Sequence, residues 1–308
     1  MSLKRKVERI INAFQGTSVK GVMHYNWFCD CDWLVRFALH YFDKETVQRK
    51  LAFISVFGPH FVFRLHKDKK KVFFTGENVN RYRHFKDLGL PFVDLSMSFE
   101  HLNNHNYLRF PLWIMYLFAP EDDEQTIREK VKKINAFHPE KTDFASLIAR
   151  NESPQGLRKE IMDALNTIAP VKAAGRLYHN DDRLWQVYDN KKIEYLKRFR
   201  FSICPENSNA PGYVTEKLFE AFLAGTIPVY WGDNNQPELQ SVNQNAVIFW
   251  TPKGDNSKAL SLIRQLQENP KLYDEFVHQA RLNDACADYV IERFYLLRQH
   301  LKKMLEEV

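Results

Sequence analysis

Apolar and polar positions alternate along this chain in short blocks, and the block at residues 200–233 shows the pattern most clearly. An apolar run at 201–204 predicts a strand, and the polar stretch after it is rich in asparagine, proline and glycine, which favour turns. Apolar positions then recur at helical spacing from residue 214 or 215, and Gly225 ends this helix before an apolar strand at 227–231. The loop after the first strand therefore lies at a carboxyl end, where open α/β sheets bind ligands.

The rest of the chain repeats this alternation. Short apolar runs predict further strands at residues 21–28, 51–57, 71–75, 92–95, 144–149 and 246–250, with helices at 33–42, 156–168, 257–267, 271–285 and 287–307. Strands that alternate with helices indicate an α/β fold with parallel sheets and helices on both faces. A highly charged stretch at 121–135 indicates an exposed helix near a domain junction. From this and the length of 308 residues we expect two domains, 1–140 and 141–308.

Composition and the absence of long apolar runs indicate the cellular compartment in which the protein is expected. With 44% hydrophobic and 27% charged residues, the chain has an ordinary soluble composition. It shows no apolar run of the ~18 residues that span a bilayer, and residues 1–15 lack the apolar core of a signal peptide, so we expect a cytoplasmic protein. The four cysteines do not suggest a disulfide framework. His24, Cys29 and Cys31 lack a fourth ligand at a usual zinc spacing, and we expect no metal site there.

The net charge of +6 and the pI near 9.0 favour an acidic partner. Two basic clusters stand out, at residues 64–71 and 191–200. The first is interpreted as a solvated turn before a strand, and the second as a surface helix. The alternative for both is contact with anionic lipid or lipopolysaccharide at the inner membrane face. No nucleic-acid-binding motif accompanies the charge, so we expect no nucleic-acid partner.

Lys217 falls in the first turn of the predicted central helix. The positive end of the helix dipole disfavours a cation there by about 0.3–1 kcal/mol. A bound anion would reverse that sign, because free amides and the ammonium would then act together. The alternative is a solvated pair of Glu216 and Lys217 on an exposed turn.

The segment PENSNAPGYVTEKLFEAFLAGTIPVYWG, residues 205–232, resembles the signature of the α-1,3/1,4-fucosyltransferases of glycosyltransferase family 10, especially the short bacterial members. Weaker similarity extends back to Phe73 and covers roughly half of the chain. The resemblance implies a GT-B fold of two Rossmann-like domains facing a cleft, with an acceptor-binding domain at 1–140 and a GDP-fucose-binding domain at 141–308. It also implies that the terminal helix packs back on the first domain; a membrane-surface helix is the alternative.

For the donor site, the resemblance implies contacts from Lys217, from the amides of its helix and from one arginine. Arg176 is nearest to the family position, and Arg158 and Arg183 are the alternatives. By the same resemblance, three more residues line the donor site: Asn207, Tyr213 and Glu216. Such groups suit a diphosphate that gains charge as the sugar leaves.

For the catalytic base, Glu100 follows the apolar stretch 91–99, and the tyrosine of a family-like YLRFPL segment comes seven residues later at 107–112. Counting back from that tyrosine places Glu100 where bacterial relatives have their proposed base, with Asp94 and Glu77 as rivals. Phe99 departs from the acid expected before it. In the acceptor site we expect three residues: Trp27, Glu77 and Asn78.

These interpretations together predict an inverting α-1,3-fucosyltransferase with GDP-fucose as donor. The predicted acceptor is an N-acetyllactosamine-type oligosaccharide or glycolipid, as in a lipopolysaccharide or Lewis-antigen precursor. No cofactor is expected to be required, and stimulation by a divalent cation is left open. Two alternatives remain: a GT-B transferase with another nucleotide sugar, and a non-enzymatic basic carbohydrate- or nucleic-acid-binding protein.

Overall fold

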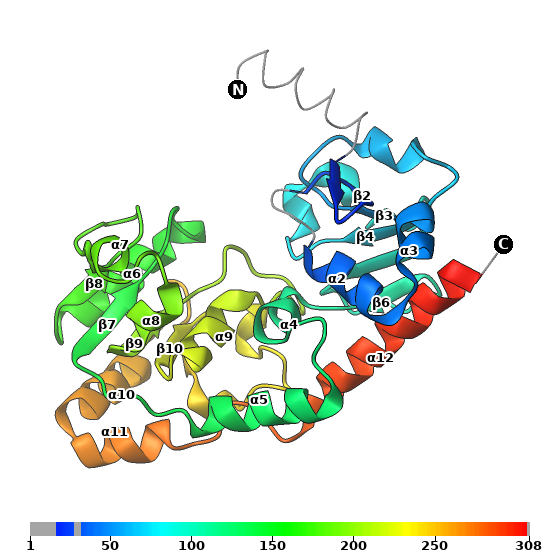
Figure 1. Cartoon of the computed structure of the whole chain (residues 1–308). Coiled ribbons are helices and arrows are strands. Elements are labelled where there is room, and N and C mark those ends of the chain that lie inside the picture. The colour runs from blue at the N-terminus through cyan, green and yellow to red at the C-terminus, as the bar shows by residue number, and fades with distance from the viewer. Residues whose placement is uncertain (1–16, 28–31, 307–308) are drawn as a thin grey trace. The chain divides into compact units, whose positions relative to one another are not determined.

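The structure is a computed structural model that describes residues 17–27 and 32–306, and it contains two compact units (Figure 1). The first unit runs to Glu124 and resumes at Val290, and the second comprises Gln125–Tyr289. The division falls earlier than the predicted boundary near residue 140, at the start of α5 (Glu124–Ala136).

The division falls earlier because the carboxyl end of α5 is hydrogen-bonded to the second unit. Asn135 Oδ1 accepts hydrogen bonds from the backbone N–H groups of Arg281 and Leu282, both at 2.9 Å. The Arg281 guanidinium in turn donates to the carbonyl of Ile134 at 2.5 Å. A charged helix that looked like a linker in the sequence is therefore part of the second unit.

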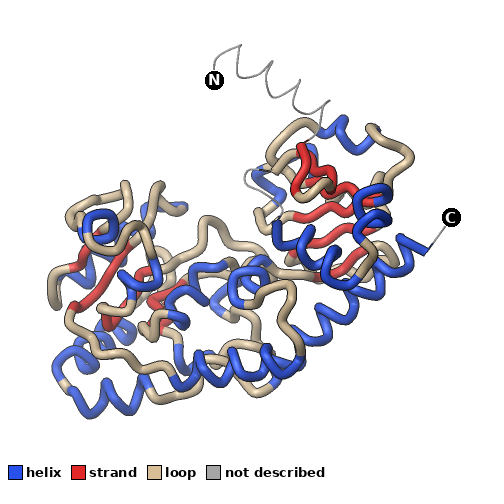
Figure 2. Tube along the Cα trace, viewed as in Figure 1, coloured by secondary structure: helices blue, strands red, loops and turns tan. Residues whose placement is uncertain are grey.

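The first unit is built on a six-stranded sheet whose strands follow their order in the chain, drawn in red in Figure 2. These strands are β1 (Thr17–Val19), β2 (Val22–Tyr25), β3 (Leu51–Ile54), β4 (Lys70–Phe74), β5 (Leu95–Ser98) and β6 (Tyr107–Arg109). β1 is antiparallel to β2, and the other neighbours are parallel. The strands are connected by α2 (Asp32–Tyr41), α3 (Lys44–Lys50) and the short 3-10 turns η1 (His60–Arg64), η2 (Val79–Arg81) and η3 (Arg83–Phe85), and α4 (Leu112–Leu117) follows the last strand.

The terminal helix α12 (Ala285–Glu306) packs on this unit through its apolar face. The ring of Phe294 lies 5.5 Å from Trp33 and 5.5 Å from Phe37, both on α2. Near the end of α12, the Leu305 carbonyl accepts a 2.8 Å hydrogen bond from Lys50 Nζ. The face considered for a membrane surface is therefore covered by protein. Within the described residues, no helix combines the length and apolar character needed to cross a bilayer.

The second unit has a five-stranded, all-parallel sheet in the order β11-β10-β9-β7-β8. Its strands are β7 (Asp143–Leu147), β8 (Val171–Ala173), β9 (Phe199–Ile203), β10 (Ile227–Tyr230) and β11 (Ile248–Phe249). Its remaining helices and turns are η4 (Pro154–Gly156), α6 (Leu157–Asn166), α7 (Arg183–Gln186), α8 (Lys192–Leu196), α9 (Glu216–Leu223), η5 (Asp233–Asn235), η6 (Gln244–Ala246), α10 (Ser257–Glu268) and α11 (Pro270–Val277).

This strand order is doubly wound, with the winding direction reversing between β7 and β9. Connections from these two strands therefore diverge, and a crevice opens between the loops at their carboxyl ends. The fold thus marks the loop after β7 and the loop after β9 as the place for a ligand.

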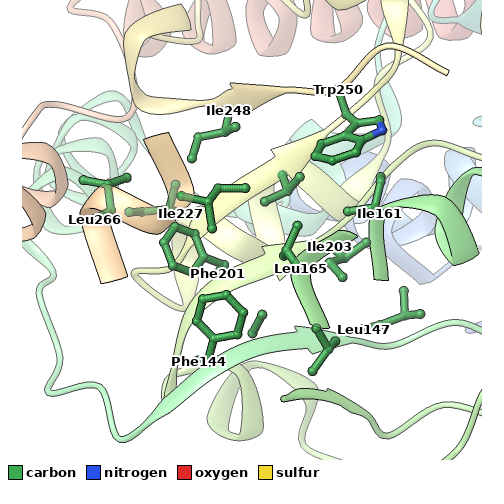
Figure 3. Close-up of a cluster of buried hydrophobic side chains, with 14 of the residues drawn as sticks. Phe144, Leu147, Ile161, Leu165, Phe201, Ile203, Ile227, Ile248, Trp250 and Leu266 are labelled. Atoms are coloured by element: carbon green, nitrogen blue, oxygen red, sulfur yellow. The ribbon is translucent and has the colours of Figure 1, made fainter. Parts of the chain in front are cut away.

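The core of the second unit is built from alternate residues of the sheet and from α6 and α10 (Figure 3). Phe201 occupies its centre: it pairs with Ala145 of β7 and with Ile227 of β10. Its ring lies 5.4 Å from that of Phe144, edge to face. Gly225 ends α9 in the left-handed conformation (φ +64°), as the sequence predicted for a helix stop.

We predict that Phe201→Ala destabilises the second unit by about 3–5 kcal/mol, because the surrounding strands cannot collapse to fill the lost volume. Val187→Ala, at a side chain that is 66% exposed in the same unit, serves as the control and should change stability by less than about 0.5 kcal/mol. Urea unfolding of the two variants measures the difference. Equal midpoints would contradict this assignment of the core.

Candidate functional site

The loops after β9 and β10 are bonded to each other. Gly212 N donates to Asp233 Oδ1 at 2.7 Å. Asn209 Nδ2 donates to Asn234 Oδ1 at 2.6 Å, and Asn234 N returns a bond to Asn209 Oδ1 at 2.9 Å. The asparagine-rich loop that the sequence marked as a turn is thereby given a fixed shape at the carboxyl edge of the sheet.

Glu206, at the start of this loop, is a fully buried carboxylate. Its Oε1 accepts from the backbone N–H of Thr215 at 2.7 Å and from the Tyr230 hydroxyl at 3.3 Å. Its Oε2 accepts from the Thr215 hydroxyl at 2.7 Å. Burial raises the pKa of Glu206, and the neighbouring Lys217 opposes that rise. The side chain therefore joins the end of β9 to the start of α9 and the end of β10.

Lys217 lies in the first turn of α9 and faces this carboxylate. Its Nζ is 2.8 Å from Thr215 Oγ1, 3.1 Å from Glu216 Oε1 and 3.4 Å from Glu206 Oε2. Burial disfavours its charged form, but Glu206 and Glu216 outweigh burial and raise the pKa of the ammonium. The pair of Glu216 and Lys217 does form, yet each side chain is only 18% exposed, so it is a shielded pair and not a solvated one.

The start of α9 places this cation beside the positive end of a helix dipole. Thr215 is the N-cap residue, and its side chain makes no capping hydrogen bond to an amide within the described part of the chain. The hydroxyl instead donates to Glu206. First-turn amides and the positive end of the helix dipole are a general anion-binding arrangement.

Arg158 brings a second cation to the same place from the other side of the switch point. It lies in the first turn of α6 and is 4% exposed. Its guanidinium donates to the Asn151 carbonyl at 2.6 Å, the Pro205 carbonyl at 3.1 Å and Asn207 Oδ1 at 3.0 Å. Arg158 thus bonds the loop after β7 to the loop after β9, and it lines the same small hollow as Lys217.

The other two arginines that the sequence offered lie elsewhere. Arg176 is exposed in the bend after β8. Arg183 is held by two acids, with its guanidinium 2.7 Å from Asp181 and 3.2 Å from Asp143, and these carboxylates raise its pKa. Geometry therefore favours Arg158 over the first choice, Arg176. The sequence did contain an indication in favour of Arg158, which is its position in the first turn of the helix predicted after the strand at 144–149.

The remaining donor-site candidates differ in exposure. Asn207 is partly exposed and bonded to Arg158. Tyr213 is 1% exposed, so its ring belongs to the core and acts on the site by packing. The hollow lined by Arg158, Lys217 and Lys192 has about 20 Å³ of free volume, room for one water molecule. It is a gap between packed charges and too small for a nucleotide.

In the first unit, Glu100 follows β5 and is partly buried. Burial raises the pKa of its carboxyl group, and among the described residues its Oε2 is buried without a hydrogen-bond partner. The Tyr107 hydroxyl donates to the Glu100 carbonyl at 2.8 Å, and Arg109 Nε donates to the Phe99 carbonyl at 2.9 Å. Two side chains of the YLR segment (residues 107–109) therefore hold the backbone at residues 99 and 100 in place by hydrogen bonds.

The rival Asp94 lies at the opposite, amino end of β5. Its carboxylate accepts from the backbone N–H of Lys71 at 2.8 Å and pairs with Lys70 at 3.4 Å. Ligands of parallel sheets bind at the carboxyl ends of strands, so the position of Asp94 favours Glu100 as the base.

The three candidate acceptor residues are partly or fully engaged by neighbours. Glu77 pairs with Arg81 at 3.5 Å. Asn78 is 4% exposed and caps η2 by accepting from Asn80 N at 3.1 Å. The Trp27 ring stacks on Phe74 with centroids 6.0 Å apart. Asn78 thus shapes a turn, and the acceptor roles of all three stay predictions.

Of the three residues considered as metal ligands in the sequence, His24 alone lies within the described residues. His24 lies in β2, and its Nε2 is 2.7 Å from Thr17 Oγ1. Cys29 and Cys31 lie outside the described residues. Within the described ranges, no group of three or more His, Cys, Asp or Glu side chains is arranged to hold a metal ion.

Two family models match the chain. The model "Glycosyltransferase family 10 (fucosyltransferase) C-term" matches residues 138–282, and "Alpha-(1,3)-fucosyltransferase FucT N-terminal domain" matches residues 26–116. Together they cover most of both units.

Known proteins show the same relationship. The alpha-(1,3)-fucosyltransferase FucT of Helicobacter pylori is 27% identical over 244 residues, which are 71% of this chain and 48% of that protein. The GDP-fucose protein O-fucosyltransferase 3 of Xenopus tropicalis is 26% identical over 64% of this chain and 42% of its own length. The chain therefore spans less than half the length of these curated relatives.

A crystal structure of an alpha1,3-fucosyltransferase with GDP-fucose is similar with a TM-score of 0.60 and 24% identity, over 92% of this chain and 89% of that one. This likeness agrees with two parallel-sheet units and shows a fold of the GT-B type. From its family matches, its relatives and its fold, the chain belongs to glycosyltransferase family 10, the fucosyltransferases.

Proposed function

We propose that the protein is an inverting fucosyltransferase that moves L-fucose from GDP-β-L-fucose to a hydroxyl of an N-acetyllactosamine-type or related oligosaccharide, with α-1,3 linkage. The observation that carries this proposal is the pair of shielded cations, Lys217 and Arg158, at the switch point of the second sheet. The donor is supported by the solved relative with GDP-fucose. The linkage is supported by the alpha-(1,3) relative from Helicobacter pylori.

The leaving group sets the task of the second unit. When the bond between the fucose anomeric carbon and the β-phosphate oxygen breaks, its electron pair stays on the diphosphate, which gains negative charge. Lys217, Arg158 and the amides at the start of α9 supply fixed positive charge and hydrogen-bond donors for that group. Because these donors are already oriented, little reorganisation accompanies the reaction.

The acceptor sets the task of the first unit. Its hydroxyl oxygen attacks the anomeric carbon from the face opposite the leaving diphosphate, and its proton passes to the Glu100 carboxylate. A raised pKa makes this carboxylate a better proton acceptor than an ordinary glutamate. A single displacement inverts the anomeric configuration and needs one base, unlike the two carboxylates of a glycosidase.

We further propose that this chemistry does not require a divalent cation, since two fixed side-chain cations provide the charge that a metal would otherwise bring. A second candidate acceptor is a protein hydroxyl, because one matched relative is a GDP-fucose protein O-fucosyltransferase. Stimulation by metal, a glycolipid acceptor and peripheral membrane contact remain predictions.

Nucleotide preference tests the proposed donor. GDP at 100 times its Kd should stabilise the folded protein by about 2.7 kcal/mol, which raises Tm by roughly 5 °C or more, whereas UDP should not. Thermal unfolding with each nucleotide measures the effect. A preference for UDP would favour another nucleotide sugar, and the absence of any nucleotide response would favour a non-enzymatic protein.

Glu100→Gln should abolish fucose transfer and leave GDP affinity unchanged, because only the proton acceptor is lost. In the wild type, transfer should fall as the pH decreases through the raised pKa of Glu100, at a higher pH than for an ordinary glutamate. Asp94→Asn is the matched control, since it neutralises a carboxylate at the other end of β5. Turnover that survives in Glu100→Gln, or is lost equally in Asp94→Asn, would refute the assignment.

Arg158→Gln should weaken GDP binding by about 10-fold or more, the loss expected for charge-assisted hydrogen bonds worth about 1.5–3 kcal/mol. Arg176→Gln should change affinity less than about 2-fold, because Arg176 is an exposed loop cation. Isothermal titration of both variants, with unfolding midpoints measured alongside, separates binding from stability. The reverse ranking would restore Arg176 as the phosphate ligand.

A further inference from the structure

We propose that Glu206 is a positioning residue of the donor site: it holds Lys217 in place as a cation and directs the Thr215 hydroxyl away from the first-turn amides of α9. This inference rests on the proposed function, in which those amides and Lys217 receive a diphosphate. Glu206 itself is fully buried, so it acts on the ligand only through Lys217 and Thr215.

Residues at the end of β10 fix the position of Glu206. Its backbone N–H donates to the Trp231 carbonyl at 2.8 Å, and the Tyr230 hydroxyl reaches its Oε1. A Cβ at Gly232 would lie 2.7 Å from Glu206 Cγ and 2.4 Å from the Tyr230 hydroxyl. Any larger residue at 232 would therefore displace Glu206 or Tyr230 from this arrangement.

The first consequence concerns the cap of α9. A threonine at an N-cap normally accepts a hydrogen bond from the second or third amide of the helix, and that bond stabilises the helix by about 1 kcal/mol. Here the Thr215 hydroxyl donates a hydrogen bond to Glu206 Oε2 at 2.7 Å and accepts one from Lys217 Nζ at 2.8 Å. Both hydrogen bonds of the hydroxyl therefore go to side chains, and it does not cap the first-turn amides of α9.

The second consequence concerns the charge of Lys217, and the same unit contains a natural comparison. Lys141 is also largely buried, but its Nζ donates to two backbone carbonyls, those of Lys197 and Ala224, each at 2.9 Å. Burial and the nearby Arg281 lower the pKa of Lys141 to about 7. Lys217 faces carboxylates instead, and its pKa is raised.

Of the two carboxylates beside Lys217, Glu206 is the one without solvent exposure, and Glu216 is 18% exposed. The Coulomb attraction of a fully buried partner is screened least. Loss of the charge on Glu206 should therefore lower the pKa of Lys217 in the direction of Lys141, with Glu216 left as its carboxylate partner and Tyr213 as the other group that favours its charge.

The test is GDP affinity as a function of pH in Glu206→Gln, which keeps the shape of the side chain and removes its charge. Between pH 7.5 and 9.0, affinity should fall by about 3-fold or more in this variant, because the lowered pKa of Lys217 lets the ammonium begin to lose its proton, and by less than about 2-fold in the wild type. Glu220→Gln is the matched control, because Glu220 lines the same hollow but pairs with Lys192. It should follow the wild-type profile.

A rescue variant separates positioning from folding. In the double variant Glu206→Gln with Lys217→Arg, the guanidinium stays charged throughout the window, so the pH dependence should disappear even if affinity is lower. A flat profile in Glu206→Gln, or a slope that persists in the double variant, would overturn the role of Glu206. Wild-type protein that binds no GDP at any pH would instead refute the proposed function.

The wild type gives a second readout that does not depend on a variant folding. Amine labelling followed by mass spectrometry should give Lys217 a higher labelling midpoint in pH than Lys271, whose side chain is 87% exposed. The midpoint, and not the rate, is compared, because exposure affects the rate. A midpoint for Lys217 at or below that of Lys271 would contradict the inference.

Discussion

The ion pair between Lys217 and the buried carboxylate of Glu206 is the interaction on which the second unit's site depends. Removing an ammonium from water costs several kcal/mol unless a countercharge faces it, and the countercharge needs hydrogen bonds of its own. Thr215 and Tyr230 supply those bonds to Glu206. The ends of β9 and β10 and the start of α9 therefore all contribute groups to one shielded ion pair.

Three cationic side chains of this protein bond to helix ends at the opposite, amino edge of its sheets. In parallel α/β units the helices end near the amino ends of the strands, and unpaired carbonyls gather there. Lys69 donates to the last carbonyls of α3, Lys141 to those of α8 and α9, and Arg200 to those of α10. The two basic clusters of the sequence are thus partly explained by helix ends, and the net charge of +6 is not by itself a sign of an acidic partner.

Local patterns predicted the fold well because hydrophobic periodicity and turn residues act over a few positions. The strand-loop-helix-strand unit around Lys217 forms as expected, with β9, α9 and β10 within a residue or two of the predicted bounds. The domain division was placed late, since only the long-range bonds from Arg281 show that α5 belongs to the second unit. Arg158 was undervalued for the same reason: its partners Pro205 and Asn207 are distant in sequence and meet it only through the crossover at the switch point.

Two classes of buried cation follow from this architecture, and they differ in the kind of partner. At the amino edge, carbonyls carry no net charge, so they fix Lys141 in place without preventing burial from lowering its pKa to about 7. At the carboxyl edge, Lys217 faces carboxylates, which outweigh burial and raise its pKa. In the proposed function Lys217 receives a diphosphate, and its carboxylate partners keep it charged for that role, whereas a lysine that only closes helix ends can donate its hydrogen bonds as a neutral amine. The partner of each lysine, more than its burial, therefore separates the two roles.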